Sequence, residues 1–508
     1  MQLSHVLEGV PLVTSELPTA LGAAEVRGLA YDSRKVEPGY LFFAFAGAKA
    51  DGAQFATSAL QRGALAVVSD RPAFAGFGGA WLQVAHGRQA LATASRNFYK
   101  RPDERLLLTA ITGTNGKTTS TSLLDAMLRA AGKITALIGT IEYHLAGRVL
   151  PAVNTTPESL DLFRMFGELE EMGGTHATLE ASSHALDLAR IYAMKFHTAG
   201  FTNFTRDHLD YHGTMEAYLA AKQLLFTPRS GPPPRFAVLN ADDEQGRRIE
   251  VSNETEVLWY GLHQAPPKRA GVNESWVRAV DVDSSFEGLR FTVLAGDRKF
   301  PVESRLVGHI NVYNVLLACS AALTLGLSES EIQKGLTELQ SVPGRFERVE
   351  QGQPFMVVVD YAHTDDALRN VISVARGMKA KQVITLFGCG GDRDRSKRPL
   401  MGMAAAEGSD YVVLTSDNPR SEDPLAIMND AMVGLRRFDT PHAAEPDRER
   451  AIRLAIEKAA PGDVVILAGK GHETYQILRD GPVPFDDREV ARRVLRAFGY
   501  ARRSGRAG

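Results

Sequence analysis

The apolar positions of the chain fall into short runs that alternate with helical patterns, an arrangement typical of α/β proteins. In the first hundred residues, the runs 41–47, 64–69 and 81–85 precede a helical pattern over 87–99. The runs 106–112, 134–141, 177–181, 200–204 and 236–240 follow, interleaved with helices, and predict a mostly parallel sheet. A third series, at 355–360, 383–387, 411–416 and 464–469, predicts another open α/β sheet.

Proline and glycine interrupt this pattern at two places. Arg101-Pro102-Asp103 separates the first series from the second, and Ser341-Val342-Pro343-Gly344-Arg345 separates the second from the third. The chain of 508 residues is also too long for one ordinary core. We therefore predict three domains, at residues 1–100, 101–340 and 341–508, with a disordered basic tail at 501–508.

Composition excludes several classes of protein. A charged fraction of 23% and a formal net charge of -2 argue against a nucleic-acid-binding protein, which normally has a basic surplus. Cys319 and Cys389 lie too far apart in sequence for a disulfide framework or a paired-cysteine metal site. The N-terminus has no secretory leader, and no apolar run approaches about 18 residues. We expect a cytoplasmic protein without a membrane span and without an obligate protein partner.

A glycine loop follows the apolar run 106–112. It reads Gly113-Thr114-Asn115-Gly116-Lys117-Thr118-Thr119 and opens a helical pattern. In such a loop, backbone N–H groups surround phosphate oxygens, Lys117 can reach the terminal phosphates, and the Thr118 hydroxyl can hold magnesium. Ile111 stands where the strict motif has its first glycine, so the loop is a variant. A simple glycine turn is disfavoured because the Gly-Lys-Thr sequence and its strand-to-helix context agree.

Polar side chains follow the next strands. Glu180 ends the run 177–181, where the carboxyl ends of parallel strands face a ligand crevice, so it can hold magnesium or remain a solvated carboxylate. The following strand leads into a segment, 205–212, that contains Asp207 and His208. A histidine there is either a ligand or a hydrogen-bonded surface group. Lys222, within the helical pattern 215–226, is by itself typical of a helix lysine that covers apolar surface.

Taken together, these segments resemble the Mur ligase family of peptidoglycan synthesis. The resemblance rests on Gly113 to Thr119, Glu180-Ala181-Ser182-Ser183-His184, 206–213 and Ala221-Lys222. Further matches at Asp32-Ser33-Arg34, Asp51-Gly52, 308–314 and Asp360-Tyr361-Ala362-His363 extend it over nearly the whole chain. It is greatest with the members that extend UDP-N-acetylmuramoyl-L-alanyl-D-glutamate (UDP-MurNAc-L-Ala-D-Glu). It implies an α/β UDP-sugar domain, a central ATPase domain with a phosphate loop and a parallel sheet, and a Rossmann-like C-terminal domain.

The resemblance also implies roles for individual residues. The ATP-binding set is Gly113, Thr114, Asn115, Gly116, Lys117, Thr118, Thr119 and Asn314. Two Mg²⁺ ions are expected, held by Thr118, Glu180, His208 and Lys222, the lysine as a carbamate. The catalytic set is Lys117, Glu180, His208 and Lys222. The UDP-substrate set is Tyr31, Ser33, Ala48, Lys49, Ala50, Asn154, Thr155, Thr156, Ser182 and Arg190.

The resemblance places the binding site for the incoming amino acid at Arg393, Asp417, Asn418, Pro419, Arg420, Gly469 and Glu473. The planar fork of an arginine suits a carboxylate. Asp417-Asn418-Pro419-Arg420 resembles the motif of family members that add meso-2,6-diaminopimelate, whose distal carbon bears a carboxylate that lysine lacks. The implied reaction transfers the ATP γ-phosphoryl group to the D-glutamate γ-carboxylate, and the diaminopimelate amine then displaces phosphate.

Three alternatives stay open. The first is the same ligase adding lysine, which Arg420 disfavours, and the second is a folylpolyglutamate-type ligase, which the Asp-Asn-Pro-Arg segment disfavours. The third is an NTP-driven switch or transport ATPase. That class would not explain a lysine at position 222 together with His208.

Overall fold

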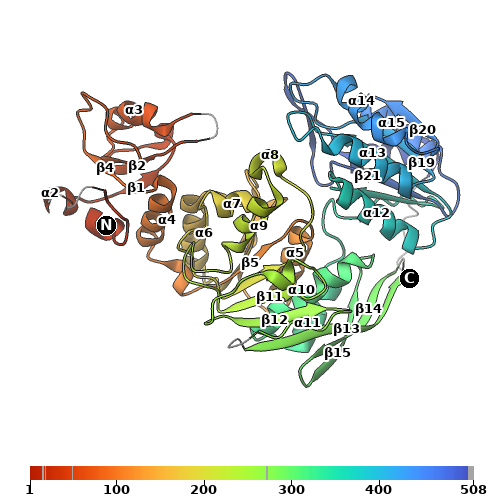
Figure 1. Cartoon of the computed structure of the whole chain (residues 1–508), viewed down its shortest axis with the longest axis horizontal. Coiled ribbons are helices and arrows are strands. Elements are labelled where there is room, and N and C mark those ends of the chain that lie inside the picture. Colours follow the sequence, from red (N-terminus) through yellow and green to blue (C-terminus); the bar gives the residue numbers. More distant parts are fainter. Residues whose placement is uncertain (14–16, 18, 48–49, 270–272, 286, 501–508) are drawn as a thin grey trace.

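The computed structural model describes residues 1–13, 17, 19–47, 50–269, 273–285 and 287–500, and three main sheets follow one another along this part of the chain. In Figure 1 the N-terminal and C-terminal units stand on either side of the central one. The predicted α/β class with three successive units is confirmed, whereas the domain limits near residues 100 and 340 stay predictions. None of the described helices is long and apolar enough to cross a bilayer.

The N-terminal sheet has four parallel strands in the order β1-β2-β3-β4. They are β1 Gly28–Ala30, β2 Tyr40–Ala44, β3 Ala66–Ser69 and β4 Trp81–Gln83; the helices are α1 Leu3–Val6, α2 Thr19–Gly22, α3 Ala56–Gln61 and α4 Gly87–Phe98, with short 3-10 turns at η1 Ser33–Lys35 and η2 Gly52–Phe55. Leu41 packs with Leu3 and Leu91 on one face, and Phe42 packs with Ala56 on the other. This alternation explains why both faces of the sheet carry helices.

The central sheet has eleven strands in the order β15-β14-β13-β12-β11-β10-β5-β9-β6-β7-β8. Its parallel part comprises β5 Leu107–Thr112, β6 Thr135–Ile138, β9 His176–Glu180, β10 Thr198–Phe201, β11 Phe236–Asn240, β12 Glu256–Gly261 and β13 Glu274–Ser285. The antiparallel edges are β7 Glu142–Leu145 and β8 Arg148–Pro151 at one end, and β14 Gly288–Ala295 and β15 Arg298–Ser304 at the other. The mostly parallel centre agrees with the prediction, but these antiparallel edges were not predicted.

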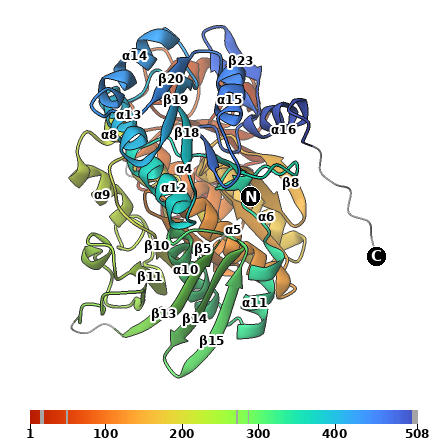
Figure 2. The same cartoon turned by 90° about the vertical axis from the view of Figure 1, so that its right-hand side faces the viewer.

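Helices cover both faces of the central sheet (Figure 2). They are α5 Lys117–Ala130, α6 Ser159–Glu171, α7 Ser183–Asp187, α8 Leu209–His212, α9 Met215–Gln223, α10 Ile310–Thr324 and α11 Glu329–Glu338, with 3-10 turns at η3 Pro102–Glu104 and η4 Gly246–Arg248. Leu124 of α5 and Leu316 of α10 share one apolar cluster, and Phe163 of α6 belongs to the other. The phosphate loop therefore opens a helix that is anchored in a buried core.

The C-terminal sheet has the order β16-β17-β21-β18-β19-β20, and only β16 is antiparallel to its neighbour. The strands are β16 Glu347–Arg348, β17 Met356–Asp360, β18 Val383–Cys389, β19 Tyr411–Ser416, β20 His442–Glu445 and β21 Val464–Ala468, followed by the hairpin β22 Tyr475–Leu478 and β23 Gly481–Pro484. Helices α12 Asp365–Gly377, α13 Lys397–Gly408 and α14 Pro424–Leu435 pack on one face, and α15 Arg448–Glu457 and α16 Asp487–Ala497 on the other. This is the open, doubly covered sheet that was predicted.

A buried ion pair joins the two helices of the second face. Arg448 Nε donates to Asp487 Oδ1 at 2.8 Å and its Nη2 donates to Oδ2 at 2.6 Å, with both side chains 0% exposed. Arg448 also donates to the carbonyls of Ser416 and Ala468, the last residues of β19 and β21. The pair therefore holds together the strand ends that lead into Asp417 and Gly469.

We expect Asp487→Asn to lower the free energy of unfolding by about 3–5 kcal/mol, because it leaves Arg448 buried and unpaired. The matched control is Glu449→Gln, which breaks the exposed pair between Arg493 and Glu449 across the same two helices. That change should cost less than about 1 kcal/mol. Urea denaturation of the full chain measures both, and equal losses would contradict this account of the buried pair.

Candidate active site

The phosphate loop leaves β5 with two glycines in conformations that favour glycine. Gly113 has φ +139° and Gly116 has φ +88°. A Cβ atom on Gly116 would lie 2.3 Å from Asn314 Oδ1, and one on Gly113 would lie 1.8 Å from Thr202 Oγ1. The backbone can therefore take this path only with glycine at these two positions. Asn314, which was predicted from the far end of the central unit, lies against the loop.

Lys117 begins α5 and folds back over the loop. Its Nζ donates to the carbonyls of Gly113 at 3.0 Å and Thr114 at 2.9 Å. Burial lowers the pKa of Lys117, and the nearby Glu180 carboxylate opposes part of that shift. The Lys117 side chain thus lies within the loop, where its positive charge would attract a bound anion.

Thr118, the residue after Lys117, contacts Glu180 at the end of β9. Thr118 Oγ1 donates to Glu180 Oε2 at 3.1 Å, and Glu180 is only 1% exposed. Thr140 donates to the same carboxylate through its backbone N–H at 2.8 Å and its hydroxyl at 3.0 Å. Hydroxyl and carboxylate oxygens are the ligands that Mg²⁺ prefers. This predicted pair is therefore brought together, and its chemistry fits one Mg²⁺ ion.

Lys222 extends from α9 and is buried against the phosphate loop. Its side chain is 1% exposed, its Nζ donates to the Gly113 carbonyl at 2.7 Å, and it lies 4.4 Å from the centre of the Tyr218 ring. Burial, and then the charge of Lys117, hold the pKa of Lys222 well below its ordinary value. A lysine that is 1% exposed does not cover the protein surface, so the surface-covering interpretation is wrong.

His208 is a second polar residue near the Tyr218 ring. The centres of the His208 and Tyr218 rings are 6.0 Å apart, and Asp207 Oδ2 is 3.4 Å from His208 Nε2. Burial lowers the pKa of His208 to about 3, so the ring is neutral. Within the described ranges, no three His, Cys, Asp or Glu side chains form a ready-made metal site.

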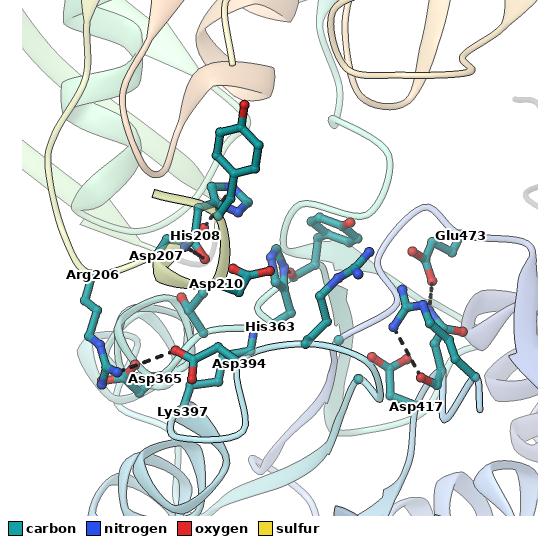
Figure 3. Close-up of a pocket in the computed structure, with 18 of the residues that line it drawn as sticks. Arg206, Asp207, His208, Asp210, His363, Asp365, Asp394, Lys397, Asp417 and Glu473 are labelled. Carbon is teal, nitrogen blue, oxygen red and sulfur yellow. Dashed lines mark hydrogen bonds and ion pairs between the residues drawn. The ribbon is translucent and has the colours of Figure 1, made fainter. Parts of the chain in front are cut away.

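A cavity of about 430 Å³ lies between the segment that carries Asp207 and His208 and the C-terminal unit (Figure 3). The central unit contributes Arg206, Asp207 and His208 to its wall. The C-terminal unit contributes Tyr361, His363, Arg393, Asp417, Asn418, Arg420, Gly469 and Glu473. Of the predicted amino-acid set, Pro419 does not line the cavity; its carbonyl packs against Gly391, where a Cβ would lie 2.0 Å away.

A buried lysine organises the carboxylates of that wall. Lys470 Nζ lies 3.2 Å from Asp417 Oδ1 and donates to Glu473 Oε2 at 3.2 Å and Asn418 Oδ1 at 2.8 Å. Burial raises the pKa of Glu473. Burial also acts to raise the pKa of Asp417, but the charges of Lys470 and Arg448 and the hydrogen bond from Lys470 together lower it. One cation between two carboxylates leaves a negative site suited to an ammonium group.

A second cavity, of about 120 Å³, lies along the phosphate loop. It is lined by Asn115, Gly116, Thr118, Thr119, Asn311 and Asn314 of the central unit and by Arg345, Tyr361 and His363 from beyond it. Arg345 Nη2 donates to Thr118 Oγ1 at 3.0 Å, although the two residues are 227 positions apart. Tyr361 and His363 line both cavities, so the two spaces share one wall.

Comparison with known proteins agrees with this geometry. Residues 25–99 match the model "Mur ligase family, catalytic domain", residues 111–322 match "Mur ligase middle domain", and residues 344–471 match "Mur ligase, glutamate ligase domain". The chain belongs to the Mur ligase family. The resemblance predicted from the sequence motifs is thus confirmed.

Relatives of this Mur ligase extend over its full length. A UDP-N-acetylmuramoyl-L-alanyl-D-glutamate--2,6-diaminopimelate ligase of Solibacter usitatus is 61% identical over 500 residues, covering 98% of this chain and 99% of the relative. A solved structure with the same enzyme name is 34% identical, with a TM-score of 0.70 and 99% and 100% coverage. MurF ligase from Thermotoga maritima, solved in complex with ADP, is 18% identical with a TM-score of 0.58 and 93% and 97% coverage, and shares the fold.

Part of the predicted UDP-substrate set of this Mur ligase lies at one edge of the central sheet. Thr156 Oγ1 donates to the Glu180 carbonyl at 2.6 Å and accepts from the Ser182 N–H at 3.1 Å. Arg190 donates to the Thr156 carbonyl at 2.9 Å and to Glu158 at 3.0 Å. Thr155 and Thr140 share a hydrogen bond of 3.1 Å between their hydroxyls. These positions therefore lie close to the Glu180 carboxylate.

The N-terminal members of that set are more dispersed. Tyr31 donates to Asp161 Oδ2 of α6 at 2.7 Å, which ties the N-terminal unit to the central one. Ser33 is buried, Asn154 and Ala50 are exposed, and Ala48 and Lys49 lie outside the described residues, as does the predicted tail at 501–508. The substrate roles of all these positions stay predictions.

Several site residues escaped the prediction. Arg345 was noted only as part of the Pro-Gly interruption, and Lys470, which follows Gly469, was not singled out, because neither position has a local pattern that reports its long-range contacts. Asp366 accepts hydrogen bonds from Asn115 at 2.8 Å and Thr205 at 3.0 Å, across the two units. Only its place near the Asp360-Tyr361-Ala362-His363 motif could have drawn attention to it.

Proposed function

We propose that this Mur ligase uses ATP to phosphorylate the D-glutamate γ-carboxylate of UDP-MurNAc-L-Ala-D-Glu and joins the product to meso-2,6-diaminopimelate, in peptidoglycan precursor synthesis. The γ-phosphoryl group of ATP passes to a carboxylate oxygen and gives an acyl phosphate and ADP. An amine of diaminopimelate then attacks the acyl carbon, a C–N bond forms, and phosphate leaves with the original carboxylate oxygen. This sequence turns an unreactive carboxylate into an acyl donor.

The observation that carries the proposal is the shared wall of the two cavities. The smaller cavity borders the phosphate loop, and the larger one is lined by Arg393, Arg420 and Glu473. An acceptor held near Tyr361 and His363 would face the nucleotide on one side and the incoming amine on the other. That arrangement suits two successive transfers at one carboxylate, because no intermediate has to travel between sites.

Two Mg²⁺ ions, when bound, supply charge neutralisation for the phosphoryl group and its acceptor. Thr118 and Glu180 are the residues for the first ion. His208 and a carbamate of Lys222 are the residues for the second. Burial lowers the pKa of Lys222 and so favours its unprotonated amine. That amine can attack CO₂, forming an N–C bond and releasing one proton, which would convert a buried base into a carboxylate-like anion. Lys117 supplies a fixed positive charge from the loop itself.

The wall of the larger cavity supports diaminopimelate as the amine. Arg420, which donates to the Gly391 carbonyl at 2.7 Å, holds its guanidinium at the rim of the cavity, and Arg393 lines the same wall. These two cations suit the distal carboxylate, and Glu473 suits the ammonium group beside it. Lysine has the ammonium group but would leave the cations unpaired.

We expect Arg420→Ala to lower kcat/KM for diaminopimelate about 10²–10³-fold, because a charge-assisted contact to the distal carboxylate is lost. The matched control is Arg395→Ala, which removes a neighbouring arginine that pairs with Asp430 and does not line the cavity. Steady-state kinetics with each variant measure both values. A loss shared by the two variants would contradict the role of Arg420.

The proposed function is tested with purified protein, ATP, Mg²⁺ and UDP-MurNAc-L-Ala-D-Glu. Phosphate release is measured after addition of diaminopimelate, lysine or glutamate in separate reactions. Release that depends on diaminopimelate supports the proposal. Equal release with lysine would make the chain the lysine-adding ligase, and release with glutamate alone would favour the folylpolyglutamate-type alternative.

A further inference from the structure

His363 occupies the wall that the two cavities share. It lies in the loop between β17 and α12, and it borders the phosphate-loop cavity and the amino-acid cavity alike. In Figure 3 it is labelled between Asp207 and His208 on one side and Asp417 and Glu473 on the other. A group at this place can reach the point where the amine and the activated carboxyl group meet.

The hydrogen bond of His363 fixes its tautomer. Its Nδ1 lies 2.8 Å from the carbonyl oxygen of Tyr361. A carbonyl oxygen can only accept, so Nδ1 carries the proton, and Nε2 of the neutral ring keeps its lone pair. The Tyr361 ring packs against the imidazole with ring centres 4.6 Å apart, which further restricts the ring orientation. His363 therefore presents a proton acceptor in a defined position.

The surroundings keep this imidazole neutral. Burial, and then the charge of Lys397, lower the pKa of His363, while Asp207 opposes the shift. The charged or titratable groups that face it from neighbouring elements are Lys397, Asp207, His208, Arg345, Asp417 and His472. At neutral pH the ring is thus free to accept a proton.

Other candidates are less suited to accept a proton from an amine. Asp417 already pairs with the buried ammonium group of Lys470 at 3.2 Å. Glu473 already accepts from Asn418 and Lys470. His208 is assigned to the second cation, where its lone pair would be used.

We propose that His363 is the catalytic base that deprotonates the incoming amine, an inference that rests on the proposed function. The ammonium group of the amino acid gives one proton to His363 Nε2, and the free amine attacks the acyl phosphate. The C–N bond forms, the bond from carbon to the bridging phosphate oxygen breaks, and the second N–H proton leaves with the phosphate. His363 then returns its proton to solvent.

The test compares two nucleophiles with the full-length protein. His363→Asn keeps a donor for the Tyr361 carbonyl but has no nitrogen at the Nε2 position. We expect it to lower diaminopimelate ligation about 10²–10⁴-fold, the usual contribution of a general base. Hydroxylamine is already unprotonated at neutral pH, so ATP-dependent hydroxamate formation from the same UDP-linked dipeptide should stay at the wild-type level. The ligation deficit should also shrink as the pH approaches the pKa of the amine.

The matched control is His472→Asn, which removes a histidine that packs on Tyr361 but lines neither cavity. It should leave the ratio of ligation to hydroxamate formation unchanged. The inference is overturned if His363→Asn loses both activities equally, since His363 would then act before amine attack, or if it loses neither. Retained hydroxamate formation also shows that the variant is folded. Failure of the proposed function is distinct, because the wild-type protein would then show no diaminopimelate-dependent reaction.

Discussion

Lys222→Ala is expected to lose about 10³-fold or more in kcat and to regain part of it when acetate or formate is added. The loss follows because the carbamate proposed at Lys222 would supply an anionic ligand, and metal stabilisation of the transition state is worth several kcal/mol. A short carboxylate would occupy the space that alanine leaves next to the Gly113 carbonyl and the Tyr218 ring. Phosphate release at increasing carboxylate concentration measures the recovery.

Two further observations sharpen this prediction. Chloride at the same ionic strength should restore nothing, because it cannot copy a carboxylate. Wild-type activity should also fall when bicarbonate and CO₂ are removed and recover when they are returned, because a lysine carbamate forms reversibly from dissolved CO₂ and burial lowers the pKa of Lys222. A variant that is fully active without added carboxylate would exclude a role for modified Lys222.

Lys117→Ala is expected to lower kcat about 10³-fold, comparable to the removal of a preorganised charge from a transition state. It is the matched counterpart of Lys222→Ala, since Lys117 is half-buried, Lys222 is buried, and both donate to the Gly113 carbonyl. Acetate should not rescue this variant, because the missing group is a cation. Phosphate release by the two variants, assayed side by side, makes the comparison. Rescue of Lys117→Ala by carboxylate, or activity within about tenfold of wild type, would contradict the assigned roles.

The parallel parts of the fold were predictable because their strands are buried on both faces and read as continuous apolar runs. The run 236–240 coincides with β11, and 411–416 coincides with β19. The antiparallel edge was missed for the opposite reason. β13, the strand with which this edge pairs, has a register shift between Val280 and Asp283, and β15 alternates exposed and buried positions. Such a strand has no strong apolar signal in the sequence.

The phosphate loop was the most predictable part of the site. Its glycines, Lys117 and Thr118 are consecutive, and the local strand-to-helix context is visible in the sequence. Glu180 was also predicted, because a strand end facing a crevice is a position that topology defines. These residues share one sheet edge, so local patterns were sufficient to bring them together.

The residues whose contacts lie far away in the sequence could not be predicted from local patterns. Arg345 reaches Thr118, and His363 borders two cavities, through a packing of units that no short motif specifies. Lys470 and Arg448 act through buried charge pairs whose partners are three to 53 positions away in sequence. Such contacts depend on how sheets and helices pack, so only the three-dimensional arrangement identifies them.

The most direct test of the central claim follows one oxygen atom. The D-glutamate γ-carboxylate of the UDP-linked dipeptide is labelled with oxygen-18, and the phosphate released in the presence of diaminopimelate is analysed by mass spectrometry. Transfer through an acyl phosphate predicts one labelled oxygen in each phosphate and one in each new amide. Unlabelled phosphate, with both labels kept in the carboxylate, would show that ATP is hydrolysed by water and would contradict the account.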